Sequence, residues 1–460
     1  MLKKSKKNSV EEIHKLSNLN VRPVFSAISK IKDRIEKEYA GQPAAPQKLV
    51  PKDAAYNPPF AAPGYKKEVE ELIEVASLTP VIHIVDSMIA EAVEQGASDI
   101  HLEPEHSQFR RRYRVDGILR HCADLPKKYE AAIISRIKIM SGMDIAEKRL
   151  PQDGRIQMKI ENKKVDLRVS TFPTLKGENL VIRILDRTRA LLELDQLGFS
   201  RETLGVFEKA VYRPYGIVLV TGPTGSGKTT TLYGALNKIN NLEKNIMTLE
   251  DPVEYEIAGV RQSQINPKAG LTFANGLRSI LRQDPDIIMV GEIRDLETAE
   301  ISIQAALTGH LVLSTLHTND AAGAIARLLD MGVEPFLVAS SIMGVLAQRL
   351  VRKICENCKE RYIPPDNILK DMSLSKETNL FEGKGCNRCL NTGYKGRIGI
   401  FEFMTPSDEI KELICKKASA VLISEAALRA GMKTLRDDGI LKVKEGLTSV
   451  TEVLRVTKEA

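Results

Sequence analysis

The stretch GPTGSGKT, residues 222–229, combines residue types and spacing suited to binding phosphate. It fits the pattern G-x-x-x-x-G-K-[S/T] and stands between a predicted strand and a predicted helix. Backbone N–H groups of such a loop close around phosphate oxygens, Lys228 would reach the β- and γ-phosphates, and Thr229 would bind Mg²⁺. These residues therefore predict a site for ATP and Mg²⁺, formed by Gly222, Pro223, Thr224, Gly225, Ser226, Gly227, Lys228, Thr229 and Thr230.

A second stretch, DIIMVGEIRD at 286–295, carries a carboxylate just beyond an apolar run. In a parallel sheet the carboxyl end of a strand neighbouring the phosphate loop faces the nucleotide. Glu292 could therefore activate a water molecule for attack on the γ-phosphate. Gly291 stands where a Mg²⁺-binding acid is often found, and Glu250, Asp251 and Glu254, after another predicted strand, could compensate.

Four of the six cysteines form two C-x₂-C pairs, Cys355 with Cys358 and Cys386 with Cys389. Four thiolates complete a closed tetrahedral Zn²⁺ site. The 27 residues between the pairs exceed the common spacing of about 15–20. Structural zinc is the prediction, and unligated reduced cysteines are the alternative.

Two folded regions are expected to position these groups. From about 200 onward, strands alternate with helices, which predicts a parallel sheet covered by helices; the strands are expected at 216–222, 245–251, 286–292 and 310–318. This α/β ATPase domain, 200–460, would include a four-Cys zinc module at 350–400 and C-terminal helices. Before it, 75–190 reads as a smaller α+β domain with a hairpin turn at Asp116–Gly117.

The N-terminal segment differs from the rest. Residues 1–40 hold ten Lys and Arg against five acids, with apolar residues near helical spacing, and 41–64 form a Pro/Ala-rich linker. The basic amphipathic segment 1–40 is a candidate for binding a partner or an anionic membrane surface. A partly helical solvated tail is the alternative.

Composition limits the class of protein. The net charge is +7, the chain is 43% hydrophobic and 28% charged, and no apolar run is long enough to span a bilayer. The first residues are basic but no apolar region follows them, so we do not expect a signal peptide. We therefore expect a cytoplasmic protein, peripherally associated with the inner face of the cell membrane, and no nucleic-acid partner, because outside 1–40 the charge is nearly balanced.

Residues 75–460 resemble the ATPases of type II secretion and type IV pilus assembly. The resemblance rests on four motifs in order: GPTGSGKTT, then TLEDPVEY (the family's Asp box), LRQDPDIIMVGEIRD (its atypical Walker B motif) and TGHLVLSTLHTND (its His box). It implies a RecA-like P-loop fold and a hexamer. It also implies site roles: Glu292 as the catalytic carboxylate, Glu250 and Glu254 near Mg²⁺ and water, and His310 and His317 on the catalytic side.

Transfer of a phosphoryl group also requires cationic stabilisation, which can come from another domain or subunit. Segments PQDGRIQ and DLRVST resemble the family segments that close over the nucleotide, and they nominate Arg155 and Arg168. Arg183 and Arg294 are weaker candidates.

The resemblance implies a motor that energises assembly of pilin or pseudopilin subunits on inner-membrane platform proteins. Alternatives are a pilus retraction motor, a nucleic-acid-translocating secretion ATPase and an ATP-gated scaffold without turnover. The four cysteines count against the retraction motor, and the absence of Trp with only 5% aromatic residues counts against the translocating ATPase.

Overall fold

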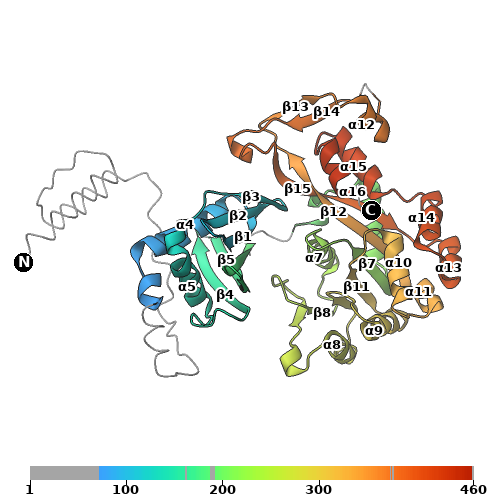
Figure 1. The fold of residues 1–460 in the computed structure, drawn as a ribbon. Helices are drawn as coiled ribbons and strands as arrows, with labels where there is room; N and C mark the ends of the chain where they lie inside the picture. The colour runs from blue at the N-terminus through green and yellow to red at the C-terminus, as the bar shows by residue number, and fades with distance from the viewer. Residues whose placement is uncertain (1–71, 161–162, 187–191, 373, 376–377, 458–460) are drawn as a thin grey trace, which may run out of the picture. The chain divides into compact units, whose positions relative to one another are not determined.

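The computed structural model describes residues 72–160, 163–186, 192–372, 374–375 and 378–457 (Figure 1). The segments predicted at 1–40 and 41–64 lie outside these described residues.

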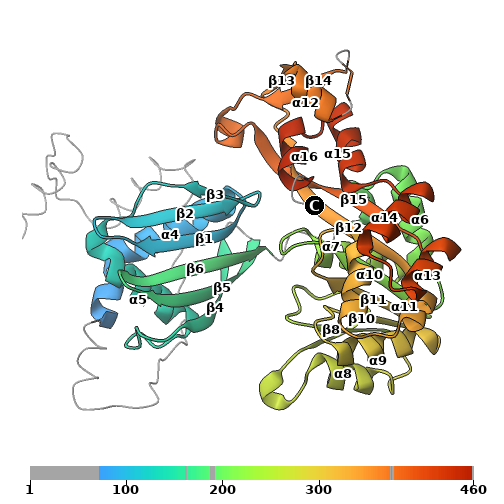
Figure 2. The same ribbon diagram turned by 45° about the vertical axis from the view of Figure 1, so that its right-hand side comes forward.

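The region up to Asp186 contains a six-stranded antiparallel sheet with the order β3-β2-β1-β6-β5-β4. Its strands are β1 (Ala97–Pro104), β2 (Phe109–Val115), β3 (Ile118–His121), β4 (Gln152–Ile160), β5 (Lys163–Thr174) and β6 (Gly177–Asp186). Two helices, α4 (Thr79–Glu94) and α5 (Glu130–Ser141), pack on each other, α4 against β1 and α5 against β4 (Figure 2). A short 3₁₀ turn, η1 (Lys127–Tyr129), precedes α5.

Local signals explain this region. Pro80 stands in the first turn of α4, where its missing N–H costs nothing, and Val81, Val85 and Met88 form the buried face. Asp116 and Gly117 both have positive φ, 51° and 86°, and they turn β2 into β3 as predicted.

The second region contains a seven-stranded sheet with the order β15-β12-β7-β11-β10-β8-β9. Its strands are β7 (Gly216–Thr221), β8 (Ile246–Glu250), β9 (Arg261–Gln264), β10 (Ile287–Val290), β11 (Leu311–Leu316), β12 (Ile342–Ile354) and β15 (Tyr394–Met404). Only the β12–β15 pair is antiparallel. The predicted α/β class with a parallel-sheet ATPase domain is confirmed.

Helices cover both faces of this sheet, so every residue of β7, β10 and β11 is buried. On one face Ile217 and Leu219 join a core with α8 (Phe273–Ile280), α9 (Leu296–Leu307), α10 (Ala321–Asp330), α11 (Pro335–Ser341), α13 (Asp408–Cys415) and α14 (Ala420–Arg429). On the other, Val218 and Val220 join a core with η2 (Leu194–Gln196), α6 (Arg201–Val211) and α7 (Lys228–Ile239). The turn η3 (Pro267–Ala269) follows β9.

A smaller unit follows β12. It comprises β13 (Lys359–Tyr362), α12 (Asp366–Asp371), β14 (Leu380–Gly383) and η4 (Asn387–Cys389), with α15 (Leu435–Lys444) and α16 (Val450–Thr457) beside it. Its apolar core joins Val351 of β12 to Leu380, Leu435 and Val453. No helix among the described residues is long and apolar enough to cross a bilayer.

Candidate nucleotide site and thiol cluster

The phosphate loop connects β7 to α7, as its sequence predicts. Gly222, Gly225 and Gly227 have φ of 147°, 80° and 91°, values that residues with a side chain rarely adopt. A Cβ on Gly222 would also lie 2.5 Å from the backbone oxygen of Gln348 in β12. The loop therefore requires glycine both for its backbone angles and for its contact with the neighbouring strand.

Lys228 occupies the first position of α7 and is only 9% exposed. Its Nζ donates to the carbonyls of Gly222 and Pro223, at 2.7 and 3.2 Å. Burial lowers the pKa of Lys228 to about 8; the Glu292 charge opposes this shift. A lysine held inside a glycine loop at a helix N-terminus fits the phosphates of a nucleotide, and Thr229 next to it is exposed and can reach a Mg²⁺ bound there.

Glu292 follows β10 and is fixed by both neighbouring strands. The N–H of Gly291 donates to Leu249 O at 2.7 Å, and Thr315 Oγ1 donates to Gly291 O at 2.7 Å. The Glu292 carboxylate accepts hydrogen bonds from Arg294 and from His317 Nε2, the latter at 3.2 Å. Burial alone would raise the pKa of Glu292, but these two partners hold it below its usual value. The carboxylate is therefore ionised near neutral pH.

The end of β11 brings His317 to the same edge of the sheet. β11 pairs in parallel with β7, with Leu316 opposite Thr221. Thr221 Oγ1 accepts a hydrogen bond from the N–H of Thr318 at 2.9 Å and lies 2.7 Å from its Oγ1. These contacts fix the His317 segment beside the start of the phosphate loop.

His310 lies at the other end of β11, contrary to the expectation that it lines the catalytic side. It precedes Leu311, which pairs with Gly216 at the amino end of β7. A strand advances about 3.3 Å per residue, so His310 and His317 are roughly 20 Å apart. The His310 Nδ1 lies 2.9 Å from Ala305 O at the end of α9, which is a structural contact.

Glu250 ends β8 and is buried, at 3% exposure. Its carboxylate accepts hydrogen bonds from Tyr233 of α7, from Thr248 at 2.5 Å and from Gln262 at 3.0 Å. The carboxylate thus joins α7 to the strands β8 and β9. No sequence signal predicts the Tyr233 contact, because a tyrosine among the apolar residues of α7 resembles any core residue.

Three arginines of the antiparallel sheet lie on adjacent strands. Arg155 of β4 pairs with Asp166 through two hydrogen bonds, Arg183 of β6 pairs with Asp99 at 3.2 Å, and the Arg168 guanidinium of β5 lies 3.5 Å from Glu254 Oε2. Burial raises the pKa of Glu254, and the charge of Arg168 opposes this shift. A cavity of about 980 Å³ has among its lining residues Arg155, Arg168, Arg183, Asp251 and Glu254.

The four cysteines predicted to bind zinc converge, and all their Sγ atoms lie within 4.8 Å of one another. The Cys355–Cys386, Cys358–Cys389 and Cys386–Cys389 Sγ separations are 3.9, 3.8 and 3.8 Å. Sulfurs about 2.3 Å from one Zn²⁺ at tetrahedral angles would be about 3.8 Å apart. The donor set and its spacing therefore fit a structural zinc ion.

Backbone N–H groups also point at this cluster. Cys389 Sγ accepts from the N–H of Cys386 at 3.2 Å and of Gly393 at 3.3 Å. Burial raises the pKa of the Cys389 thiol, but these N–H groups bring it down to about 6. Such contacts favour the thiolate that a metal requires.

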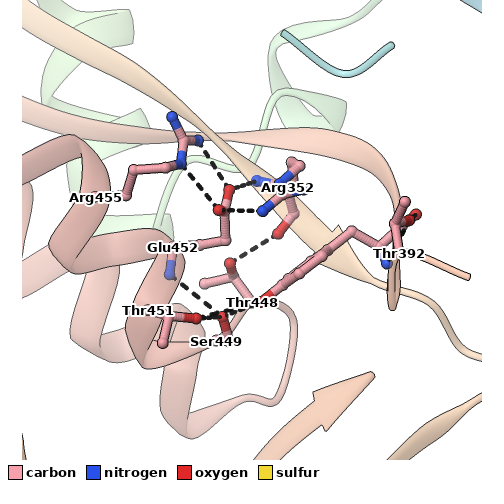
Figure 3. A network of polar contacts seen from close by, with 8 residues as sticks. Arg352, Thr392, Thr448, Ser449, Thr451, Glu452 and Arg455 are labelled. Atoms are coloured by element: carbon pink, nitrogen blue, oxygen red, sulfur yellow. Dashed lines mark hydrogen bonds and ion pairs between the residues drawn. The ribbon is translucent and has the colours of Figure 1, made fainter. Parts of the chain in front are cut away.

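A polar network around the buried carboxylate of Glu452 joins β12 to α16 (Figure 3). Arg352 of β12 and Arg455 of α16 both bind the carboxylate of Glu452, which is 2% exposed. The Arg352 guanidinium also lies 4.1 Å from the ring centre of Tyr394 in β15. The network ties the C-terminal helix to both strands, and no sequence motif had indicated it.

The arrangement at the carboxyl ends of β7, β10 and β11 defines a P-loop ATPase. The chain belongs to the family described as type II/IV secretion system protein, whose sequence profile matches residues 74–455. The predicted resemblance to secretion and pilus assembly ATPases is confirmed.

Two relatives illustrate the similarity. The type II secretion system ATPase E of Vibrio cholerae is 50% identical over 393 residues, covering 85% of this chain and 78% of that protein. The type IV pilus assembly ATPase PilB of Myxococcus xanthus is 45% identical over 455 residues, covering 97% of this chain and 80% of that protein.

Solved structures agree at the level of the fold. The pilus retraction motor PilT with bound ADP matches with a TM-score of 0.54 and 26% identity, covering 81% of this chain and 97% of that one. The Legionella pneumophila ATPase DotB matches with a TM-score of 0.62 and 21% identity, covering 83% of this chain and 97% of that one.

Proposed function

We propose that this protein is a hexameric motor that hydrolyses ATP to assemble pilin or pseudopilin subunits, in type II secretion or type IV pilus extension. The observation that carries the proposal is the Glu292 carboxylate, held after the end of β10 by Arg294 and His317, at the same edge of the sheet as the phosphate loop with its buried Lys228. The relatives named above are a secretion ATPase and a pilus assembly ATPase, which supports the biological role.

In the proposed reaction Glu292 accepts a proton from the attacking water, and Lys228 binds the β- and γ-phosphates. In this structure Arg294 and His317 are both hydrogen-bonded to the Glu292 carboxylate. When ATP binds, the Arg294 and His317 side chains would donate hydrogen bonds to the γ-phosphate instead. The Glu292 carboxylate would then be free to bind water. His317 would thereby report the presence of the γ-phosphate.

Arg155 and Arg168 would supply the remaining positive charge. Arg168 is paired with Glu254, and burial raises the pKa of this carboxyl group because it disfavours the charged form. A phosphate carries more negative charge and would replace Glu254 as the partner of Arg168. We propose that each nucleotide site is completed by a neighbouring subunit, so that a monomer is nearly inactive.

Two metal ions have separate roles in this proposal. Mg²⁺, held with the phosphates at Thr229, would neutralise charge on the transferred group, and Glu254 would orient its water ligands. Zn²⁺ at Cys355, Cys358, Cys386 and Cys389 would be structural, because four thiolates leave no open coordination position.

We further propose that the motor works in the cytoplasm against inner-membrane platform proteins, with residues 1–40 as a contact to the partner or to anionic lipid. The pairing of the β2 arginines supports a protein cargo rather than a nucleic acid. The arginines of β2 are ion-paired with carboxylates, such as Arg111 with Glu91 and Arg112 with Glu103. Paired arginines do not offer the open basic surface that a nucleic acid requires.

The test is phosphate release by purified wild type and by Glu292→Gln, with nucleotide binding and oligomeric state measured for both. We expect the variant to bind ATP as wild type does and to lose at least 100-fold in turnover. Glu300→Gln, an exposed position on α9, is the matched control and should hydrolyse normally. A wild-type hexamer that binds ATP without releasing phosphate would instead support an ATP-gated scaffold.

Mixing two inactive variants tests the shared site. If Arg168 acts on a neighbour's nucleotide, combining Arg168→Ala with Glu292→Gln subunits creates some sites with both groups intact, and activity reappears. No recovery in mixed hexamers would place both groups on one chain.

A further inference from the structure

Gln348 lies in the middle of β12, is 2% exposed and contacts the phosphate loop directly. Its Nε2 donates to Ser226 O at 2.6 Å, and its Oε1 accepts from Thr231 Oγ1 at 2.7 Å. β12 lies beside β7 and pairs with it in parallel (Figure 1). Ala347 is opposite Thr221, so Gln348 is level with the first loop residue. One side chain thus joins β12, the loop and α7.

The two contacts fix the orientation of the amide group. A backbone carbonyl only accepts hydrogen bonds, so the NH₂ of Gln348 must face Ser226. The Thr231 hydroxyl can then donate to the amide oxygen. Methionine has neither a donor nor a strong acceptor for these partners, and glutamate has acceptors only.

Holding the Ser226 carbonyl also orients the next amide. In a planar trans peptide the C=O of one residue and the N–H of the next point in opposite directions. With the Ser226 carbonyl held toward β12, the Gly227 N–H is turned away from that strand. Gly227 is the N-cap of α7, and a phosphate loop binds its ligand through N–H groups at this position.

The packing leaves little freedom for this arrangement. A Cβ on Gly222 would lie 2.5 Å from Gln348 O, and one on Gly227 would lie 3.0 Å from Gln348 Nε2. β12 therefore contacts the loop at both its first and its last glycine, and Gln348 makes both contacts.

We infer that Gln348 is a positioning residue for phosphate binding: it orients the Ser226–Gly227 peptide so that the Gly227 N–H faces the nucleotide. This inference rests on the proposed nucleotide site and adds a residue outside the loop to it. Gln348 acts through the peptide, so its loss weakens ADP and ATP binding alike. The turnover of bound ATP depends on Glu292 and changes much less.

The experiment compares ADP affinity, by titration calorimetry, in wild type, Gln348→Met, Gln348→Glu, Thr231→Val and Gln348→Met/Thr231→Val. We expect about tenfold weaker ADP binding for Gln348→Met, as loss of one good hydrogen bond produces, and a larger loss for Gln348→Glu, whose carboxylate faces a carbonyl. Thr231→Val should weaken binding less and add little to Gln348→Met, because both act on one amide. The KM for ATP should rise in parallel, with kcat within about threefold of wild type.

Gln304→Met and Gln304→Glu make the same changes on the exposed side of α9 and should bind ADP normally. Wild-type ADP affinity in folded Gln348→Met and Gln348→Glu would overturn the inference, and so would a lower melting temperature with unchanged affinity. If both Gln348 variants fail to fold, Thr231→Val decides, and an unchanged Kd overturns the inference. A wild type that binds ADP but releases no phosphate would contradict the proposed hydrolysis alone.

Discussion

The buried Glu452 carboxylate of α16 joins this helix to β12. It accepts from Arg352 Nη2 at 2.6 Å, from the backbone N–H of Arg352 at 3.1 Å, and from Arg455 Nε and Nη2 at 2.9 Å each (Figure 3). Burial alone would raise the pKa of Glu452, but these donors lower it to about 2. We expect Glu452→Gln, which keeps the shape and removes the charge, to loosen α16.

The size of the effect follows from that pKa. An unfolded glutamate has a pKa of about 4.3, and each unit of difference is about 1.4 kcal/mol, so the ionised carboxylate contributes about 3 kcal/mol. Because the folded pKa is depressed, this stability is present above about pH 4.5 and is lost as the pH falls through about 2. By pH 3 about half of it remains.

Hydrogen exchange of the α16 amides measures this local stability without requiring the whole chain to unfold in one step. About 3 kcal/mol corresponds to roughly 100-fold faster exchange in Glu452→Gln than in wild type at pH 7, narrowing to about tenfold at pH 3. The matched control is Glu412→Gln, whose partner Lys416 is 3.6 Å away with both side chains 72% exposed. Such an exposed pair is worth well under 1 kcal/mol.

Two results would refute the reasoning about Glu452. One is an amide exchange rate of α16 in Glu452→Gln that is within threefold of the wild-type rate at pH 7. This would mean that the desolvation cost of Glu452 cancels the energy of its ion pairs. The other is a difference between variant and wild type that is the same at pH 3 as at pH 7, which would assign the effect to packing.

Three further substitutions test the loop, the Glu250 network and the thiol cluster. Gly222→Ala, strained at φ 147° with its Cβ 2.5 Å from a β12 carbonyl, should weaken ADP binding at least tenfold by calorimetry; unchanged binding would contradict the rigid loop. Tyr233→Phe removes a buried partner of Glu250 and should lower the free energy of unfolding by about 1–3 kcal/mol in urea, whereas a neutral result would mean that water replaces the hydroxyl. Gly393→Ala places a Cβ 2.1 Å from Gly383 O, so bound zinc should fall in metal analysis while ADP affinity persists; full zinc content would show that the two segments can separate.

The parts of the site that the sequence predicted are those with local signals. The phosphate loop needs glycines, a lysine and a hydroxyl in nine consecutive residues, and its flanking strand and helix are each recognisable alone. The two C-x₂-C pairs identified four cysteines that do converge, although the spacing between the pairs was unusual. The Asp116–Gly117 turn likewise marked its hairpin by backbone chemistry that does not depend on distant contacts.

The parts that were missed depend on pairing between distant segments. β12 is buried over most of its length on both faces, so it lacks the alternation that marks a half-exposed strand, and Gln348 and Arg349 interrupt its apolar run. Gln348 is 122 residues from Ser226 in the sequence, so its role can be predicted only when β12 is known to lie beside β7. His310 and His317 lie near opposite ends of one predicted strand, and only the parallel register of that strand with β7 shows which of them is near the phosphate loop.

The strand β12 contacts the phosphate loop and leads into the thiol cluster. β12 is hydrogen-bonded to β7 on one side and to β15 on the other, and it runs from the phosphate loop at Gln348 directly into Cys355. The pairing of β12 with β7 covers only Ile342–Ala347; beyond it the strand pairs with β15 alone, with a register shift between Arg352 and Ile354. Within this stretch Glu452 binds Arg352 near the thiol cluster, whereas Gln348 binds the carbonyl of Ser226 in the phosphate loop. Because no β7 pairing extends along this stretch, loss of zinc at the thiol cluster is expected to leave the phosphate loop, and with it the ADP affinity, unchanged, as predicted for Gly393→Ala.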